Sequence, residues 1–177
     1  LGVINTIGLK DFIIFDLGGA STEVTLVKNR HIVKAVSLPI GALTLTGTYQ
    51  KGDEYTPKEL EKMTKAVKKT IKEHTWLQNI KLPLLGIGGT ARNIAKIDQR
   101  KLSYPITKLH NYELPYHRFH EILEDVKGKS LEARKKISGL SSDRADIIIA
   151  GLTIVDELFN YVNTKTLVVG GCGLREG

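Results

Sequence analysis

The hydrophobic positions of this chain fall into short continuous runs, which predict strands, and into stretches of helical spacing. A short apolar run rich in β-branched or aromatic residues is typical of a strand in a protein core. On this basis the strands are predicted over 12–16, 24–28, 31–38, 83–85 and 166–169. Asn29 and Arg30 separate the second run from the third and predict a tight hairpin, because Asn tolerates positive φ.

Helical spacing is clearest after residue 55. Thr56 predicts an N-cap, Pro57 suits the first turn, and Glu59 completes a capping box. Apolar residues then recur on one helical face, at Leu60, Met63, Val67 and Ile71. Further helices are predicted over 40–49, 90–97, 115–128 and 130–136, and from Ser141 or Ser142 to Val162. Strands and helices in this order predict an α/β domain.

The stretch from Phe12 to Glu23 combines a core strand with polar chemistry. Asp16 ends the strand, and the two glycines that follow allow a tight turn whose N–H groups could cradle phosphate oxygens. Ser21 adds a hydroxyl, and Glu23 adds a second carboxylate. Carboxylates beside an anionic ligand point to a divalent cation or a water between them. An ordinary hairpin capped by Asp16 explains the same residues and stays open as an alternative.

A second strand ends in a glycine turn at Gly88, Gly89 and Thr90, and a helical run follows. Such a helix N-terminus can bind phosphate through its dipole and free N–H groups. Two turns of this kind suggest that two loops converge on one ligand. The spacing of Gly86, Gly88 and Ala91 also fits a dinucleotide fingerprint, but no acidic residue follows about 20 positions downstream, which disfavours that interpretation.

Composition narrows the class of protein. The 177 residues are 41% hydrophobic and 25% charged, which is ordinary for one globular domain with its own core. A single cysteine excludes an internal disulfide framework and fits the reducing cytoplasm. No apolar run approaches the roughly 20 residues of a membrane span, and no leader segment is evident. We therefore expect a cytoplasmic protein that does not bind membranes.

The net charge of +7 would suit a polyanionic partner. Many lysines lie together on the helix after Thr56, so a solvated helix face is the simpler explanation. That face lacks interleaved aromatic residues, which argues against single-stranded nucleic acid, and we expect no specific nucleic-acid partner. A homodimer of the intact protein is left open.

The two glycine turns, together with Val168 to Gly177, resemble motifs of the exopolyphosphatase and guanosine pentaphosphate phosphohydrolase family. This family lies within the superfamily of actin, sugar kinases and heat-shock chaperones. Shorter segments agree in the family's order: Ser37 to Gly41, Gly139-Leu140, Arg144 to Ile148, and Ala150-Gly151. The resemblance implies a ribonuclease-H-like lobe, with a mixed five-stranded sheet flanked by helices. It also implies that residues 1–177 form the second, C-terminal lobe of a two-lobed core, with the first lobe and anything after Gly177 absent.

The resemblance further implies a hydrolase that uses Mg²⁺ to release terminal phosphate from inorganic polyphosphate or guanosine pentaphosphate. Asp16 would orient the Mg²⁺, and Glu23 would help to hold the metal or the attacking water. The general base is expected upstream of Leu1, so this chain alone is expected to show little activity. The residues expected to bind two neighbouring phosphates are Gly18, Gly19 and Ser21 for one, and Gly88, Gly89 and Thr90 for the other.

Two other functions stay open: an ATP-dependent kinase of the same superfamily, and a non-catalytic module that binds an alarmone or a protein partner. Ala20 stands where the family usually has a third glycine, which would cost about 1 kcal/mol if positive φ were needed there. His117 and His120 lie at a spacing that metals can use, but a surface helix face is the preferred interpretation.

Three other residues receive no firm role. Cys172 has no phosphatase loop or nearby catalytic histidine around it, so we expect a small buried side chain. Arg175 could contact phosphate or anchor the chain that follows. Arg144 is interpreted as a solvent-facing residue at a helix start, without chemistry.

Overall fold

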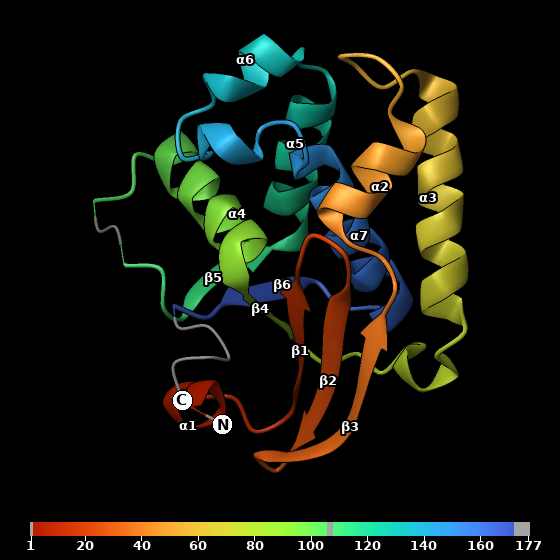
Figure 1. Cartoon of the computed structure of the whole chain (residues 1–177). Coiled ribbons are helices and arrows are strands. Elements are labelled where there is room, and N and C mark those ends of the chain that lie inside the picture. Colours follow the sequence, from red (N-terminus) through yellow and green to blue (C-terminus); the bar gives the residue numbers. More distant parts are fainter. Residues whose placement is uncertain (1, 106–107, 172–177) are drawn as a thin grey trace.

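A six-stranded mixed sheet forms the centre of the computed structural model, which describes residues 2–105 and 108–171 (Figure 1). Its strands are β1 (Phe12–Leu17), β2 (Thr22–Lys28), β3 (His31–Leu38), β4 (Leu84–Ile87), β5 (Tyr112–Pro115) and β6 (Thr166–Val169). They lie in the order β3-β2-β1-β4-β6-β5. The pairs β1/β4 and β4/β6 are parallel, and the remaining pairs are antiparallel. The expected α/β class with a mixed sheet is confirmed.

The sheet has six strands rather than the expected five because Tyr112–Pro115 forms β5 at one edge. This segment is short, and its buried residues alternate with more exposed ones, so it lacks the continuous apolar run that marks β1 or β6. Pro115 ends the strand, and proline is tolerated on an edge strand because a missing N–H does little harm there. Such a segment carries a weak strand signal in the sequence.

The hairpin between β2 and β3 forms as expected. Asn29 and Arg30 have φ values of 49° and 65°, and two central residues of positive φ define the turn whose twist matches antiparallel strands. The N–H of Asn29 donates to Asp11 Oδ1 at 2.7 Å, which fixes the hairpin tip to the segment before β1.

Seven α-helices accompany the sheet in the described ranges: α1 (Gly2–Thr6), α2 (Ala42–Tyr49), α3 (Pro57–Lys72), α4 (Gly88–Lys101), α5 (Tyr116–Lys127), α6 (Leu131–Lys135) and α7 (Ile148–Val162). The capping box of α3 is confirmed. Thr56 accepts from the N–H of Glu59, and the Glu59 carboxylate accepts from the N–H of Thr56. The described residues also contain two short 3-10 turns, η1 (Thr75–Leu77) and η2 (Ser142–Arg144).

The predicted start of the last long helix at Ser141 or Ser142 is wrong, because α7 begins at Ile148. Residues 142–144 instead form η2, and Ser141 makes no side-chain cap there. Its N–H donates to Asn93 Oδ1 of α4 at 2.8 Å, so a contact with a distant helix fixes this segment. The turn η2 carries Arg144, whose position matters below.

The two faces of the sheet are covered unequally. Ile13 and Phe15 of β1 belong to the larger core cluster, which packs against α3, α4, α5 and α7. The alternate β1 positions, Phe12 and Ile14, belong to a smaller cluster with Val3, Ile4 and Ile7 of the α1 region. Figure 1 shows α1 at the bottom of the molecule, away from α6 at the top and from α2 at the upper right. The face toward α1 therefore has the thinner cover.

A buried carboxylate fixes α4 against β5 and α5. Asp98 is 2% exposed, and its carboxylate accepts from Tyr112 Oη at 2.6 Å and from the Arg118 guanidinium at 3.0 Å. Burial and the bond to Asp98 raise the pKa of the Tyr112 phenol. Because both partners come from different elements, this cluster fixes the helix that begins at the second glycine turn.

Candidate functional site

The strands β1, β4 and β6 run parallel, so their carboxyl ends lie at one edge of the sheet, where α/β proteins usually bind ligands. Asp16 lies near the end of β1 and is half-buried. Its neighbours across the strands are Glu23 on β2 and Ile87 on β4. Cβ atoms of directly opposed antiparallel residues lie roughly 4.5–5.5 Å apart. The two carboxylates are therefore neighbours on one face of the sheet.

That face follows from strand periodicity. Side chains two residues apart on a strand share a face, so Asp16 continues the row of Phe12 and Ile14. Glu23 likewise shares its face with Val27 of the same cluster. The carboxylate pair therefore lies on the thinly covered side of the sheet, beyond the apolar contacts of α1, rather than inside the larger core.

Glu23 is oriented by two serines. Ser21 Oγ and Ser37 Oγ each donate to Glu23 Oε1 at 2.8 Å. Ser37 lies opposite Glu23 on β3, so the row Asp16, Glu23, Ser37 crosses three adjacent strands. Ser37 had no predicted role. The Ser21 hydroxyl, which was expected to bind phosphate, donates to a carboxylate instead and holds that carboxylate in place.

The first glycine turn offers backbone donors. Gly18 N–H donates to Ser21 O at 2.9 Å and closes the hairpin tip. The N–H groups of Gly19, Ala20 and Ser21 have no acceptor among the described residues. Three consecutive N–H groups without an acceptor at an exposed turn are available to donate to a phosphate group. The predicted phosphate contact of this turn is therefore best made by backbone N–H groups.

The carbonyl groups of the same turn contact α2. Ala42 N–H donates to Gly18 O at 3.0 Å, and the N–H groups of Leu43 and Thr44 donate to Gly19 O at 2.9 and 3.0 Å. These donors are the first N–H groups of α2, which otherwise lack partners inside the helix. The N-terminus of α2 therefore supports the glycine turn rather than a ligand.

Ala20 adopts the turn without strain. It is absent from the described residues of positive φ, so the replacement of the family's third glycine imposes no left-handed backbone. The anticipated cost of about 1 kcal/mol applies only to a residue in that region. The tightness of this turn is therefore compatible with the sequence.

The second glycine turn forms the N-terminus of α4. Gly88 has φ +87°, a conformation that favours glycine. Ile87 provides no side-chain cap, and the N–H groups of Gly88, Gly89 and Thr90 have no acceptor among the described residues. The free donors and the positive end of the helix dipole make this terminus suited to an anion.

Thr90 contributes to this terminus through its backbone. Its side chain is 3% exposed and packs against Gly151 of α7, where an added Cβ would lie 3.2 Å from Thr90 Cγ2. The hydroxyl expected to bind phosphate is therefore directed toward the helix layer. Gly151 therefore allows α7 to approach α4 closely at this point.

The two glycine turns meet at Asp16. A Cβ built on Gly88 would lie 2.7 Å from Asp16 Oδ1, so the carboxylate covers the start of α4 directly. Glycine is required here both by the positive φ and by this close approach. The ends of β1 and β4, whose turns are 70 positions apart in sequence, therefore lie side by side, and their convergence on one ligand stays a prediction.

Arg144 lies at the same corner. A Cβ built on Gly89 would lie 2.2 Å from Arg144 Cζ, so the guanidinium packs directly on the N-terminal turn of α4. Arg144 has no carboxylate within 4.0 Å among the described residues. Arg144 was interpreted as a solvent-facing residue at a helix start, without chemistry. The solvent-facing placement is wrong, because the side chain extends from η2 toward the glycine turn. Only the motif from Arg144 to Ile148 pointed to this residue.

The carboxylate pair fits a hard cation that retains water. Mg²⁺ is usually bound by one or two carboxylates together with substrate phosphates. Asp16 and Glu23 supply that number of protein ligands beside free N–H donors. The described part of the chain contains no group of three or more His, Cys, Asp or Glu that could hold a metal alone. His117 and His120 are exposed on α5, and His120 lies beside the Tyr116 ring.

Cys172 and Arg175 lie outside the described residues, together with most of the C-terminal motif. No helix within 2–105 or 108–171 is long and apolar enough to cross a bilayer.

A mixed sheet whose parallel strands end in two glycine turns is the architecture of an actin-like lobe. All 177 residues match the Ppx/GppA phosphatase family, and the chain belongs to that family. A solved Ppx/GppA family member from Aquifex aeolicus superposes with a TM-score of 0.86 at 27% identity, over 99% of this chain and 57% of that one. The family prediction is therefore confirmed.

Curated relatives include an Exopolyphosphatase 2 of Mycobacterium tuberculosis, 26% identical over 83% of this chain and 46% of the relative. A guanosine-5'-triphosphate,3'-diphosphate pyrophosphatase of Pseudoalteromonas translucida is 26% identical over 93% of this chain and 32% of the relative. A bifunctional 3-dehydroquinate synthase/phosphatase of Fusobacterium nucleatum is 29% identical, over 95% and 26%. The chain thus spans between about a quarter and a half of these relatives.

Proposed function

We propose that this chain supplies the metal- and phosphate-binding lobe of a phosphoanhydride hydrolase. The substrate would be inorganic polyphosphate or guanosine pentaphosphate, the classes that the relatives' names indicate. The observation that carries the proposal is the contact of Asp16 Oδ1 with the Gly88 position, which joins a carboxylate pair to a helix N-terminus whose first N–H groups have no acceptor among the described residues. Phosphoryl transfer requires mainly positioning and charge neutralisation, and this corner can provide both.

The proposed role of each group follows from its position in the corner. The N–H groups of Gly19 to Ser21 would bind one phosphate, and those of Gly88 to Thr90 the neighbouring one. Arg144 would add a planar, permanently charged donor beside the second phosphate. Ser21 and Ser37 would keep Glu23 directed toward the corner. Water would attack the terminal phosphorus as it loses a proton to the general base, the bridging P–O bond would break, and the shortened chain would leave with the bond's electrons.

Mg²⁺, when bound, would neutralise phosphate charge and polarise the reacting oxygens. Asp16 would be its protein ligand, directly or through water, and Glu23 would hold a water molecule bound to the same Mg²⁺. We assign the general base to no residue of this chain. A solved relative is longer, and 1–177 cover 57% of it, which supports the proposal that this chain forms one lobe of a two-lobed core.

Phosphate release tests the proposal on the intact protein that contains this chain. Asp16→Asn and Glu23→Gln should each lower turnover of polyphosphate by roughly 10²-fold, because each removes charge from the reacting corner. Asp53→Asn and Glu113→Gln are matched controls, since both carboxylates are exposed and neither belongs to the segments that form the reacting corner. Near-normal turnover in Asp16→Asn would overturn the role of that carboxylate.

A single cysteine in the sequence suits the reducing cytoplasm, where we propose that the protein acts. Comparing guanosine pentaphosphate with polyphosphate in the same phosphate-release assay would identify the preferred substrate. Binding of either compound without any hydrolysis by the intact protein would favour the non-catalytic alternative.

A further inference from the structure

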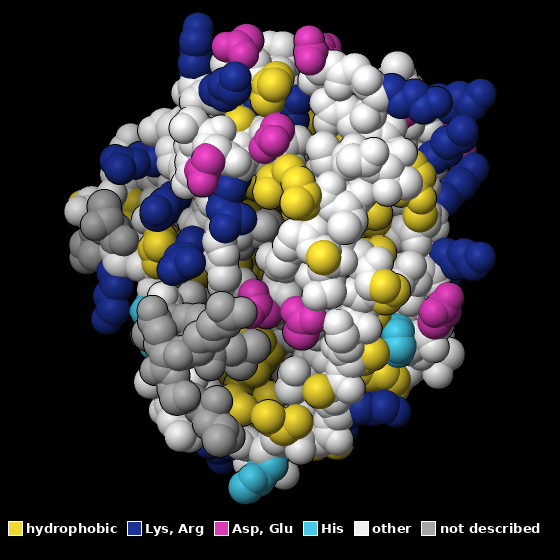
Figure 2. All heavy atoms as spheres, viewed as in Figure 1, with side chains coloured by type: hydrophobic (Ala, Val, Ile, Leu, Met, Phe, Trp, Pro, Cys, Tyr) yellow, Lys and Arg dark blue, Asp and Glu magenta, His cyan; other side chains and the backbone are white. Residues whose placement is uncertain are grey.

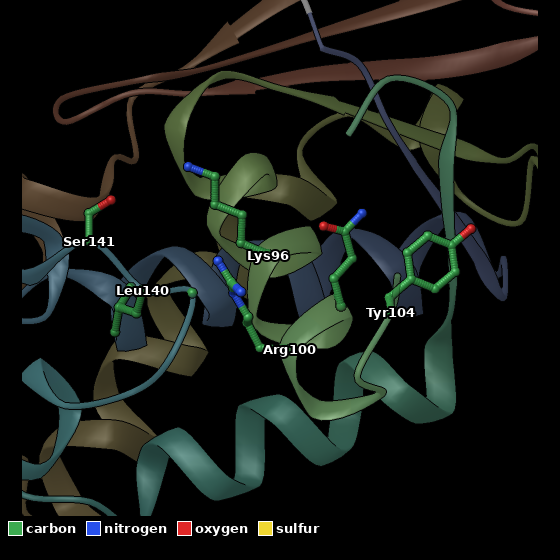
Figure 3. Close-up of a pocket in the computed structure, with 7 residues that line it drawn as sticks. Lys96, Arg100, Tyr104, Leu140 and Ser141 are labelled. Carbon is green, nitrogen blue, oxygen red and sulfur yellow. The ribbon is translucent and has the colours of Figure 1, made fainter. Parts of the chain in front are cut away.

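A separate pocket of about 310 Å³ lies beside the second half of α4 (Figure 3). Its lining residues are Lys96, Gln99, Arg100, Tyr104, Gly139, Leu140 and Ser141. Two cations, an amide and two hydroxyl-bearing side chains line this pocket, and no carboxylate of the described residues does. Figure 3 shows Lys96 and Arg100 rising from the same helix, with Ser141 across from them and Tyr104 on the other side. Such a lining suits an anion.

The wall opposite α4 is held in place by close contacts. Gly139 has φ +94°, and a Cβ on it would lie 2.6 Å from the carbonyl carbon of Lys96. The turn therefore approaches the helix backbone as closely as only glycine allows. The bond from Ser141 N–H to Asn93 Oδ1, at 2.8 Å, fixes the next residues of the wall. The pocket is thus part of the packed structure rather than a gap between exposed loops.

The cations of this pocket are not neutralised. Neither Lys96 nor Arg100 has a carboxylate within 4.0 Å in the described part of the chain, and both are exposed. A few lysines of the described residues do pair within their own helix, as Lys65 does with Glu61 and Lys127 with Glu124, whereas these two cations do not. Figure 2 shows Lys and Arg side chains gathered over the α4 region.

The pocket lies on the same helix face as the glycine corner. Gly89, Asn93, Lys96 and Arg100 are spaced by four, three and four residues, which places them along one face of α4. Asn93 connects the two sites, because its Nδ2 donates to Gly89 O at 2.8 Å while its Oδ1 accepts from the pocket wall. At 1.5 Å per residue, Lys96 and Arg100 lie roughly 10 and 16 Å along the helix from Gly89.

We propose that this pocket is a distal phosphate subsite, in which Lys96 and Arg100 bind phosphate groups remote from the one being released. This inference rests on the proposed function, since it assumes that the terminal phosphate occupies the glycine corner. Two ligands offer a second phosphate group at such a distance: the inner phosphates of a long polyphosphate chain, and the 3′-diphosphate of guanosine pentaphosphate. Their shared chemistry is a condensed phosphate carrying several charges, which Arg binds with two parallel hydrogen bonds.

Calorimetric binding to the intact protein tests the subsite with two pairs of ligands. Long-chain polyphosphate is compared with tripolyphosphate, and guanosine pentaphosphate is compared with GTP, which lacks the 3′-diphosphate. Lys96→Ala/Arg100→Ala should weaken the longer ligand of at least one pair by about tenfold or more, because two charge-assisted contacts are lost. The shorter ligand should bind as it does to the unaltered protein. The pair that responds identifies the natural source of the phosphate.

Lys58→Ala/Lys62→Ala is the matched control, with two exposed cations spaced alike on α3. At ~0.15 M salt, interactions between exposed charges are screened beyond about 8 Å. The control should therefore change each affinity less than twofold. An equal loss in the control, an equal loss for both ligands of each pair, or no loss at all would overturn the subsite. If no ligand binds the unaltered protein, the proposed function itself fails. Should the alanine pair misfold, Lys96→Gln/Arg100→Gln repeats the test with similar side-chain lengths.

Discussion

The contact between Asp16 and Gly88 makes a quantitative prediction for Gly88→Ala. The left-handed backbone costs a non-glycine residue about 1–2 kcal/mol, and forcing a methyl group into a filled space costs about 1–3 kcal/mol. A Gly→Ala change recovers about 0.4–1 kcal/mol by restricting the unfolded chain. With a built Cβ only 2.7 Å from Asp16 Oδ1, Gly88→Ala should lower the free energy of unfolding by about 2–4 kcal/mol.

A double-mutant cycle separates the two causes. In an Asp16→Ala background the carboxylate is gone, so Gly88→Ala should cost only the backbone term, about 1 kcal/mol after the unfolded-state gain. The coupling between the positions should therefore be about 1–3 kcal/mol. Urea unfolding followed by the fluorescence of the single Trp76 measures all four proteins.

Gly47→Ala is the control for this cycle, because an added Cβ there meets nothing within 4 Å inside α2. It should stabilise the protein by about 0.5–1 kcal/mol, the usual gain for Ala over Gly within a helix. A coupling energy below about 0.5 kcal/mol, within the usual error of additive sites, would refute the contact between Asp16 and the start of α4.

Three further predictions concern single side chains. Ser37→Ala removes a hydrogen bond to Glu23 and should lower phosphate release by the intact protein about tenfold, as loss of an orienting partner usually does; unchanged turnover would contradict that role. Arg144→Ala should weaken tripolyphosphate binding about tenfold in calorimetry, with a smaller effect for Arg144→Lys, which keeps the charge; equal affinities would refute the contact. Burial raises the pKa of Glu157 above its ordinary value of 4.5, with Lys68 acting in the opposite direction. The protonated form is favoured in the folded state, so Glu157 destabilises the protein as pH rises above 4.5. Glu157→Gln should therefore raise the thermal midpoint at neutral pH and lose that advantage below pH 4.5. A higher thermal midpoint of the variant at acidic pH alone would contradict this prediction.

The parts of the fold that the sequence predicted are those with local signals. The Asn29-Arg30 hairpin and the Thr56 capping box depend on residues a few positions apart, and both formed as expected. The edge strand β5 escaped prediction because four residues with a charged member and a proline carry little periodicity. The start of α7 was misplaced because Ser141 resembles an N-cap, while a bond to Asn93 fixes it instead.

The candidate site likewise has parts with a local signal in the sequence and parts without one. The turns at Gly18 and Gly88 were recognisable as strand ends followed by glycine, and the parallel pairing of β1 with β4 brings them together. Ser37 and Arg144 reach the site only through strand pairing and a turn 55 residues after Gly89, contacts that spacing in one sequence does not reveal. The hydroxyl groups of Ser21 and Thr90 were correctly placed near the turns, but their hydrogen bonding and packing direct them to Glu23 and α7.

The bonds from α2 to the carbonyl groups of Gly18 and Gly19 have a mechanical consequence. A glycine-rich tip would ordinarily lose much conformational freedom on closing around a ligand. Here three N–H groups of a packed helix already hold that tip, so the ordering occurs during folding rather than during binding. Any ligand that displaces the tip must also shift α2 against its neighbours. The turn is therefore a rigid part of the binding site rather than a mobile loop.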